Sequence, residues 1–425
     1  LVVGYSKDSP LECVMPVAGP TAPTRRAFAE LLAEARTRTV LLVSALSAEQ
    51  ISSQPDPEVG SVLSELERIV LFEDRMLTEN PGHLPGIRSY DEWFDVMTDV
   101  RQRALQRLNE LDLGDDPVSQ DRFRLVLEHE YRRCESILES LQARGDPYRP
   151  HQERRLPRGR RLADPGMMVR FPGGTVQIGA APEAAAWPEE KPAHRVAVQP
   201  FWIDLMPVTN GDFMTFMAEG GYTQRDVWSE EGWQWLKQSQ AYMPCNWLWQ
   251  DGSWWNRRLG RDAPIDLTAP VAQVSFYEAE AFARFVGKRL PSEIEWEAAA
   301  TWDPETQTRR HYPWGNMPPS YYVANLDELA FGPAAVGAFP GNVSPIGCYG
   351  MIGDVWEWTA SEFTPYPGSD ETAAELVECG FSRDYKVLRG GSWATRPGAV
   401  RSSSRRPAAP HARVHFTGFR CARDC

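Results

Sequence analysis

A histidine and an arginine one helical turn apart, within residues 121–138, are the residues whose type and spacing first suggest chemistry. Apolar residues recur through this stretch at helical spacing, so we expect an amphipathic helix. His129 and Arg133 would then project from the same flank, because side chains at i and i+4 lie one turn apart. Two histidines at this spacing could hold one metal ion. Arg133 cannot serve as a ligand, since a guanidinium is permanently charged and has no lone pair to donate.

Three further helical patterns precede this helix, and together the four predict a four-helix bundle over residues 23–145. These patterns cover about 24–46, 59–77 and 90–111, with Arg68 opposite the apolar stripe of the second. Residues 1–22 show no sustained period and are expected to form a flexible arm.

Residues 146–166, rich in Arg, Pro and Gly, are expected to form a solvated linker. From residue 167 to 425 the pattern changes to short strands, frequent Gly and Pro, and nearly all of the tryptophans. Only 210–218 and 275–286 show convincing helical patterns there. This pattern of short strands, few helices and many Gly and Pro residues predicts a large, irregular α+β domain with long loops.

Composition narrows the functional classes. The net charge of −13 argues against a nucleic-acid or membrane-surface binder, and no apolar run approaches the length of a membrane span. Seven scattered cysteines fit reduced thiols better than a disulfide framework, and no complete secretory signal is visible at the start. We therefore expect a cytoplasmic protein whose partner is a small molecule; the sequence identifies no protein partner.

Seven motifs of the second half occur in an order that resembles the formylglycine-generating-enzyme type of domain. They are PVTNGDF (207–213), GGYTQRDVWSEEGWQW (220–235), KRLPSEIEWEAAA (288–300), YPWGN (312–316), IGDVWEWTASEF (352–363), VLRGGSWAT (387–395) and FTGFRCARD (416–424). Their order and wording are most similar to the EgtB-like sulfoxide synthases of ergothioneine biosynthesis. The resemblance covers about residues 25–424. It implies an N-terminal DinB-like four-helix bundle followed by an irregular, loop-rich domain of the FGE-sulfatase, C-type-lectin-like kind.

The resemblance also implies chemistry that depends on iron and oxygen. In this family, three histidines of the bundle hold a non-haem iron(II). A thiol, γ-glutamylcysteine or cysteine, is joined to the imidazole of hercynine, and its sulfur is oxidised to a sulfoxide. Imidazole ligands suit iron, and open coordination positions would accept thiolate and oxygen.

Carried over residue by residue, the three iron-ligand positions fall on Arg68, His129 and Arg133. The family segment W-x-L-x-H-I falls on residues 64–69, and H-E-x-x-H falls on residues 129–133. One imidazole between two guanidinium groups is a poor site for a divalent cation, because like charges repel. The resemblance therefore predicts that the iron site is lost.

Other functional positions of the family also differ. The segment in which a catalytic tyrosine is expected, 369–380, contains none. The substrate-binding Asp and Arg of the family fall on Ala408 and Ala412, and the loop that supplies another substrate arginine is shortened to about 78–88. Copper-dependent formylglycine-generating enzymes need two cysteines in the loop that falls on 394–399, which has none.

Two interpretations of the arginines remain open. If Arg68 and Arg133 occupy the former iron pocket, they form a cationic cleft suited to a carboxylate or phosphate, which arginine binds with two parallel hydrogen bonds. Otherwise the two arginines point to solvent, as charged helix faces usually do. Glu65, Glu67 and Glu130 could add carboxylates to a metal site, but a salt-bridge network with Arg68 and Arg133 is their plainer interpretation.

Metal could also be held elsewhere. Three histidines could rebuild a site around a pocket loop: His129, His411 and His415. Three oxygen-bearing residues occur in loops where this type of domain often holds a structural calcium: Asn325, Asp354 and Glu357.

Two functions follow as hypotheses. In the first, the chain is an EgtB-like homologue that has lost iron chemistry and acts as a binding or regulatory pseudoenzyme. In the second, it is an active EgtB-like enzyme that forms a carbon–sulfur bond on a histidine-derived substrate with a repositioned iron.

Overall fold

The structure is a computed structural model that describes residues 24–78, 86–111, 113, 116–145, 147–148, 155–159, 164, 166–181, 184–327, 330–370 and 380–425. The arm predicted for residues 1–22 lies outside these ranges. So do most of the predicted linker 146–166, of the shortened loop 78–88, and of the tyrosine-free segment 369–380.

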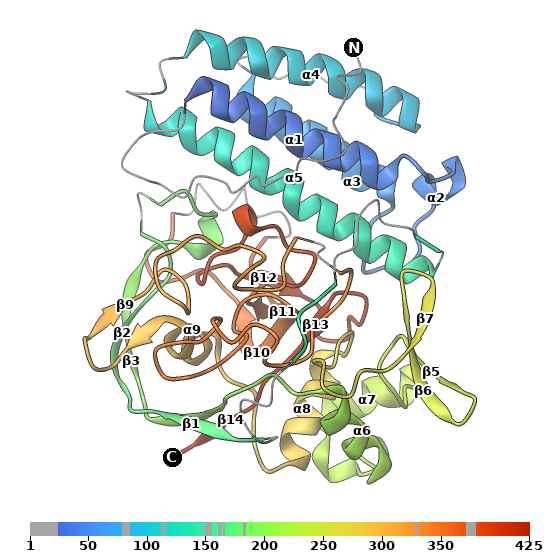
Figure 1. The fold of residues 1–425 in the computed structure, drawn as a ribbon, viewed down its shortest axis with the longest axis vertical. Coiled ribbons are helices and arrows are strands. Elements are labelled where there is room, and N and C mark those ends of the chain that lie inside the picture. Colours follow the sequence, from blue (N-terminus) through green and yellow to red (C-terminus); the bar gives the residue numbers. More distant parts are fainter. Residues whose placement is uncertain are drawn as a thin grey trace.

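Four long helices form the upper layer of the molecule (Figure 1). They are α1 (Arg25–Val43), α3 (Val62–Leu77), α4 (Tyr90–Glu110) and α5 (Pro117–Arg144), with the short α2 (Ala48–Ser52) after α1. Helix α3 packs against α4 and α5, and α1 packs against the same two helices. Each long helix begins at a residue whose side chain accepts a backbone N–H of the first turn: Thr24, Ser61, Ser89 and Asp116. The four helical patterns of the sequence therefore correspond to the four long helices, although α5 is longer than the stretch 121–138.

The loop-rich domain is built around a four-stranded sheet with the order β12-β11-β10-β13. Its strands are β10 (Trp356–Phe363), β11 (Ser382–Arg389), β12 (Arg406–Ala408) and β13 (Thr417–Gly418). A second sheet pairs β1 (Met168–Phe171) with β4 (Phe201–Asp204) and β4 with β14 (Ala422–Asp424), so the end of the chain returns to the start of the domain.

Shorter elements fill the rest of this domain. The paired strands are β2 (Gly174–Ile178) with β3 (His194–Val198), β5 (Trp247–Gln250) with β6 (Ser253–Arg258), β6 with β7 (Arg261–Pro264), and β8 (Trp302–Asp303) with β9 (Thr308–Arg309). The α-helices are α6 (Asn210–Ala218), α7 (Glu230–Ser239), α8 (Phe276–Phe285) and α9 (Glu293–Thr301). Single 3₁₀ turns are η1 (Pro188–Glu190), η2 (Arg225–Val227) and η4 (Pro397–Ala399). Helices α7 and α9 add to the two that the sequence pattern predicted.

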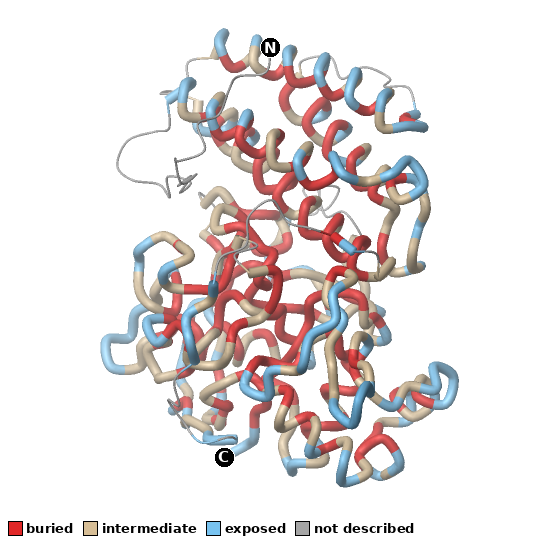
Figure 2. The backbone as a smooth tube through the Cα atoms, turned by 45° about the vertical axis from the view of Figure 1, so that its right-hand side comes forward, coloured by how far each residue is buried: buried red, intermediate tan, exposed pale blue. Residues whose placement is uncertain are grey.

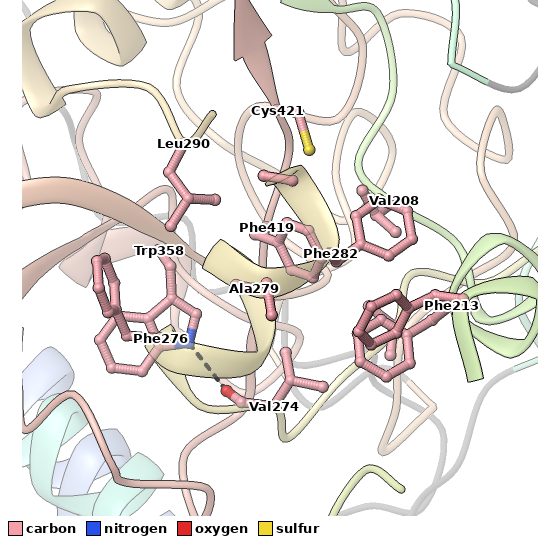
Figure 3. Close-up of a cluster of buried hydrophobic side chains, with 14 of the residues drawn as sticks. Val208, Phe213, Val274, Phe276, Ala279, Phe282, Leu290, Trp358, Phe419 and Cys421 are labelled. Atoms are coloured by element: carbon pink, nitrogen blue, oxygen red, sulfur yellow. Dashed lines mark hydrogen bonds between the residues drawn. The ribbon is translucent and has the colours of Figure 1, made fainter. Parts of the chain in front are cut away.

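Aromatic side chains make up much of the core of this domain. Figure 3 shows Phe213 of α6, Phe282 of α8 and Phe419 packed together, and the buried Trp358 packed against Phe276. The indole N–H of Trp358 donates to the carbonyl of Val274 at 2.9 Å. Burying this indole therefore leaves no unpaired donor, which would cost free energy in an apolar core.

The bundle and the loop-rich domain share buried surface. One apolar cluster combines Leu66 of α3 and Leu138 of α5 with Trp393 and Phe416 of the loop-rich domain. Figure 2 shows buried residues, in red, continuing from the helices into the domain below them. Helix α5 therefore contributes to both parts, and a site between them would be held on a packed scaffold. No helix among the described residues is both long enough and apolar enough to cross a membrane.

Candidate functional site: a charged cavity between the bundle and the loop-rich domain

A cavity of about 500 Å³ lies where α3 and α5 face the four-stranded sheet. Residues 57–60, just before α3, form part of its wall, and β10 and β12 form another part. Of the residues singled out from the sequence, the lining includes Arg68, Arg133, Ala408 and His415. The cavity therefore includes two of the three positions that the resemblance assigns to iron ligands.

Those two arginines share one buried carboxylate. Arg133 Nη1 donates to Glu65 Oε2 at 2.9 Å, and Arg68 Nη1 donates to Glu65 Oε1 at 3.4 Å. The Arg133 side chain is 12% exposed and that of Arg68 is 56% exposed, so the first pair is enclosed and the second lies at the rim. Glu65 thus joins α3 to α5 with an ion pair at the positions where the resemblance places metal ligands.

The arginines of the expected cationic cleft are accompanied by an equal number of glutamates in the cavity lining. Five arginines and five glutamates line the cavity: Arg68, Arg132, Arg133, Arg405 and Arg406, with Glu58, Glu65, Glu135, Glu139 and Glu189. Their formal charges cancel when His415, which also lines the cavity, is neutral. Glutamates of α3, α5 and the loops supply the counter-charges that the sequence could not place.

Glu130 belongs to another network and does not pair with the cavity arginines. It is buried inside the bundle, where Arg36 Nε donates to it at 2.8 Å and Arg101 Nη2 at 3.2 Å. Burial raises the pKa of Glu130, but the two guanidinium groups outweigh that effect and lower the pKa to about 2. The predicted network of Arg68 and Arg133 therefore includes Glu65 and excludes Glu130.

Two glutamates of α5 that line the cavity form hydrogen bonds to the loop-rich domain. Glu135 accepts hydrogen bonds from Trp356 Nε1 at 2.9 Å, Ser392 Oγ at 2.5 Å and Thr395 Oγ1 at 2.8 Å. Glu135 is 3% exposed, so all three bonds lie in the interior.

Glu139 lies one turn further along α5 and contacts a guanidinium and an imidazole. Its Oε2 accepts a hydrogen bond from Arg406 Nη2 at 2.6 Å and lies 3.0 Å from His415 Nδ1. Burial raises the pKa of Glu139, but Arg406 and His415 outweigh burial and lower the pKa to about 2. The carboxylate is therefore ionised throughout the neutral range.

Arg132 closes another side of the cavity. Its Nη1 donates to Glu189 at 3.0 Å, and its guanidinium lies 4.3 Å from the centre of the Trp187 ring. Burial raises the pKa of Glu189 even though Arg132 is beside it. This wall therefore combines a cation–π contact with a buried ion pair.

The three histidines of the proposed rebuilt metal site do not come together. His129 is buried in the bundle and stacks on Phe72, with ring centres 4.1 Å apart and planes 9° apart. His411 is exposed, with Nε2 2.9 Å from Glu58, and His415 pairs with Glu139. Within the ranges that the structure describes, no three His, Cys, Asp or Glu residues are grouped so as to hold a metal ion. The residues at the family ligand positions do not fit iron, because two of the three are arginines paired with Glu65.

The proposed calcium ligands also fail to form one site. Asn325 Nδ2 donates to Asp354 Oδ1 at 2.8 Å, and the same oxygen accepts the backbone N–H of Ala334. Glu357, however, accepts hydrogen bonds from Arg420 at 2.7 and 2.8 Å and from the Trp296 indole at 2.8 Å. The Glu357 carboxylate is therefore paired with the buried Arg420 and forms no site with Asn325 and Asp354.

The sequence reasoning missed Glu135, Glu139, Trp356 and Arg406. A signal for the two glutamates was present. Glu128, Glu135 and Glu139 follow one another by seven and four residues, which places them on one face of a helix. A carboxylate stripe on a helix that is otherwise buried indicates cationic or donor partners on a neighbouring element.

Comparisons with known proteins identify the type of the second domain and relatives of nearly the whole chain. Residues 152–425 match the FGE-sulfatase family, described as a sulfatase-modifying factor enzyme 1-like domain. The hercynine oxygenase of Mycolicibacterium smegmatis is 38% identical, over 94% of this chain and 99% of its own. That of Mycobacterium tuberculosis is 37% identical, over 92% of this chain and 97% of its own. That of Mycolicibacterium thermoresistibile is 36% identical, over 96% of this chain and 97% of its own. Because similarity of this degree extends over nearly the whole chain, the chain belongs to the hercynine oxygenase family, with a sulfatase-modifying-factor-type domain in its second part.

Proposed function

We propose that this member of the family is a binding or regulatory protein that takes up a small anionic molecule in the cavity and does so without iron. The observation that supports the proposal is the ion pair of Arg133 with Glu65, together with Arg68 at the rim. Both arginines lie at positions that the family resemblance assigns to iron ligands. A metal there would face two guanidinium charges and one imidazole packed against Phe72.

Arg68 is the residue best placed to receive an anion. Its side chain is half exposed, and its contact with Glu65 is long at 3.4 Å, while Arg133 holds the same carboxylate at 2.9 Å. A ligand carboxylate or phosphate could therefore engage Arg68 while the Arg133–Glu65 pair stays formed. Arginine presents parallel N–H donors that match two oxygens of such a group.

Elemental analysis of the purified protein, with an iron(II) titration under anaerobic conditions, tests the first half of the proposal. We expect no stoichiometric iron. Near-stoichiometric iron would contradict the proposal and would mean that other residues hold the metal.

Binding of small anions tests the second half. Arg68→Ala should weaken binding of sulfate or a small carboxylate at least tenfold, because it removes the exposed guanidinium, and the double variant with Arg133→Ala should abolish it. Arg26→Ala removes an arginine that is 86% exposed on α1, away from the cavity, and is the matched control. Binding that is unchanged in Arg68→Ala would refute the assignment of this residue.

A second function is supported by the comparisons. Identity of 36–38% over nearly the whole chain to proteins named hercynine oxygenase favours an active enzyme that forms a carbon–sulfur bond in ergothioneine-type thiol biosynthesis. Such an enzyme would need iron held by residues other than Arg68 and Arg133. The assay is incubation with hercynine, a thiol, iron(II) and oxygen, with mass spectrometry for a sulfoxide product. A product would favour this function over the first.

A further inference from the structure

His415 is the one imidazole among the described residues that line the cavity. The five arginines and five glutamates of the lining carry opposite formal charges in equal number. An imidazole, in contrast, gains or loses its charge between about pH 5 and 8. The formal charge of the described lining is therefore zero with a neutral His415 and +1 with a protonated His415.

Charged groups of both signs surround His415. Its Nδ1 lies 3.0 Å from Glu139 Oε2, and the same carboxylate oxygen accepts a hydrogen bond from Arg406 Nη2 at 2.6 Å. Arg406 Nη2 also lies 3.2 Å from Nδ1, and its Nη1 lies 3.7 Å from Glu135. Glu65 of α3 adds a further negative charge near Arg406. His415 thus contacts one carboxylate of α5 and one guanidinium of β12, and the carboxylate of α3 lies near that guanidinium.

Protonation changes what the ring can do. A neutral imidazole has one N–H donor, whereas a protonated ring donates from both nitrogens. With Nδ1 directed at Glu139, the second donor, Nε2, is the nitrogen left for a ligand. Residue His415 is 9% exposed, so that interaction would take place in a largely enclosed space, where charge–charge attraction is strong.

We propose that His415 couples anion binding to proton uptake, so that the cavity binds a small oxyanion together with one proton on the imidazole. The inference rests on the proposed function, since it assumes that the ligand is anionic. It specifies the ligand as a carboxylate or a sulfate-like group small enough to reach Nε2 of His415 and a cavity arginine together. No covalent bond is made or broken; one proton moves from solvent to the ring.

Thermodynamic linkage fixes the sign and the size of the effect. If one proton is taken up with each anion, affinity rises by at most about tenfold for each unit by which the pH falls through the range of the imidazole. Without proton uptake, the affinity for an anion that does not itself titrate stays constant over the same range. The change of anion affinity with pH therefore shows whether His415 takes up a proton when the anion binds.

The test is isothermal titration of the full chain with sulfate and, separately, with pyruvate, from pH 6 to pH 8. Neither probe titrates in this range, and buffers with different heats of ionisation give the number of protons taken up. We expect affinity to rise severalfold to tenfold per unit of falling pH and proton uptake to approach one. A stronger response to sulfate would assign a tetrahedral oxyanion, and a stronger response to pyruvate a carboxylate.

Variants separate His415 from other titrating groups. His415→Gln should lose the pH slope, and His415→Asn, whose amide nitrogen can replace Nδ1 toward Glu139, should lose it while keeping that contact. His411→Gln, at the exposed rim, is the matched control, and Glu189→Gln removes the carboxyl whose pKa is raised by burial. Both should keep the slope. Binding that does not change with pH, or a slope that survives in both His415 variants, overturns the inference alone. Absence of binding by either probe throughout the range overturns the proposed function as well.

Discussion

Replacing Glu135 by alanine should destabilise the whole chain, because this carboxylate joins α5 to the loop-rich domain. Three donors depend on it: the Trp356 indole N–H at 2.9 Å, the Ser392 hydroxyl at 2.5 Å and the Thr395 hydroxyl at 2.8 Å. The residue is 3% exposed, so water does not replace it without a rearrangement. Arg406, with Nη1 at 3.7 Å, would also lose one of its counter-charges.

The expected loss is about 3 kcal/mol. A buried donor without an acceptor costs about 1–3 kcal/mol, and the Trp356 N–H donates to the carboxylate that the substitution removes. The hydroxyls of Ser392 and Thr395 can rotate toward other acceptors, so each adds only about 0.5–1 kcal/mol. Removing the buried charge also recovers part of its desolvation cost, which keeps the total below the sum of the three bonds. Glu135→Gln keeps one oxygen acceptor and should lose about 1–2 kcal/mol.

Urea unfolding followed by tryptophan fluorescence and by far-UV circular dichroism measures the loss. With a slope of about 3 kcal/mol per M, Glu135→Ala should shift the midpoint by about 1 M. Glu110→Ala is the matched control, because this glutamate of α4 is 53% exposed and its change should stay within about 0.5 kcal/mol. If Glu135→Ala shifts the midpoint no more than Glu110→Ala does, the interior hydrogen bonds do not hold the two parts together.

Three further predictions concern stability. Leu66→Ala, in the fully buried core of α3, should cost about 2–5 kcal/mol in urea unfolding, whereas Leu71→Ala on the exposed face of the same helix should cost under about 1 kcal/mol; equal losses would contradict the packing described. Gly353→Ala should lower the urea midpoint strongly, because Gly353 has φ +89° and a new Cβ would lie 2.5 Å from a backbone oxygen. In the control Gly341→Ala the new Cβ would have no atom within 4 Å, so this change should be tolerated. Glu130 has a pKa of about 2 in the folded chain, below its ordinary 4.5. Its ionised form therefore contributes about 3 kcal/mol to the free energy of unfolding, which is complete above pH 4.5 and is lost as the pH falls toward 2. Urea midpoints measured over that range should fall, and Glu130→Gln should make them depend less on pH.

The sequence predicts the bundle well, because its helices are amphipathic and each begins at a capping side chain. Helix α9 (Glu293–Thr301) shows why other elements were missed. Its buried face includes Glu293 and Glu297, which pair with Arg405 and Arg389 in the interior. Charged residues on the buried face remove the apolar stripe by which a helix is detected. Such pairs depend on partners about a hundred residues away, which no local pattern contains.

The candidate site was predictable in position and less so in composition. Residue spacing places His129 and Arg133 on one flank of α5, and the structure agrees that they lie one turn apart. Their surroundings nevertheless differ, since Arg133 lines the cavity while His129 stacks on Phe72 within the bundle. Two residues four positions apart are rotated by a few tens of degrees around the helix axis. Because α5 is packed on several sides, this rotation is enough to place His129 in the core of the bundle and Arg133 on the wall of the cavity. Of the five carboxylates that balance the arginines, two come from α5 itself and three from other segments, and only folding brings them together.

The Arg68–Glu65–Arg133 pairing joins α3 and α5 at the place where the family resemblance puts a metal, and this predicts a scaffold that does not need one. If no iron is bound, adding 2,2′-bipyridine should leave the urea midpoint unchanged, because a bound metal stabilises a fold only to the extent that it binds the folded state. Glu65→Ala should instead lower stability by about 3–5 kcal/mol, since it leaves Arg133 enclosed without this carboxylate, whereas Arg68→Ala at the rim should cost less than about 1 kcal/mol. A midpoint that falls with the chelator and is insensitive to Glu65→Ala would show that metal, and not this ion pair, holds the two helices together.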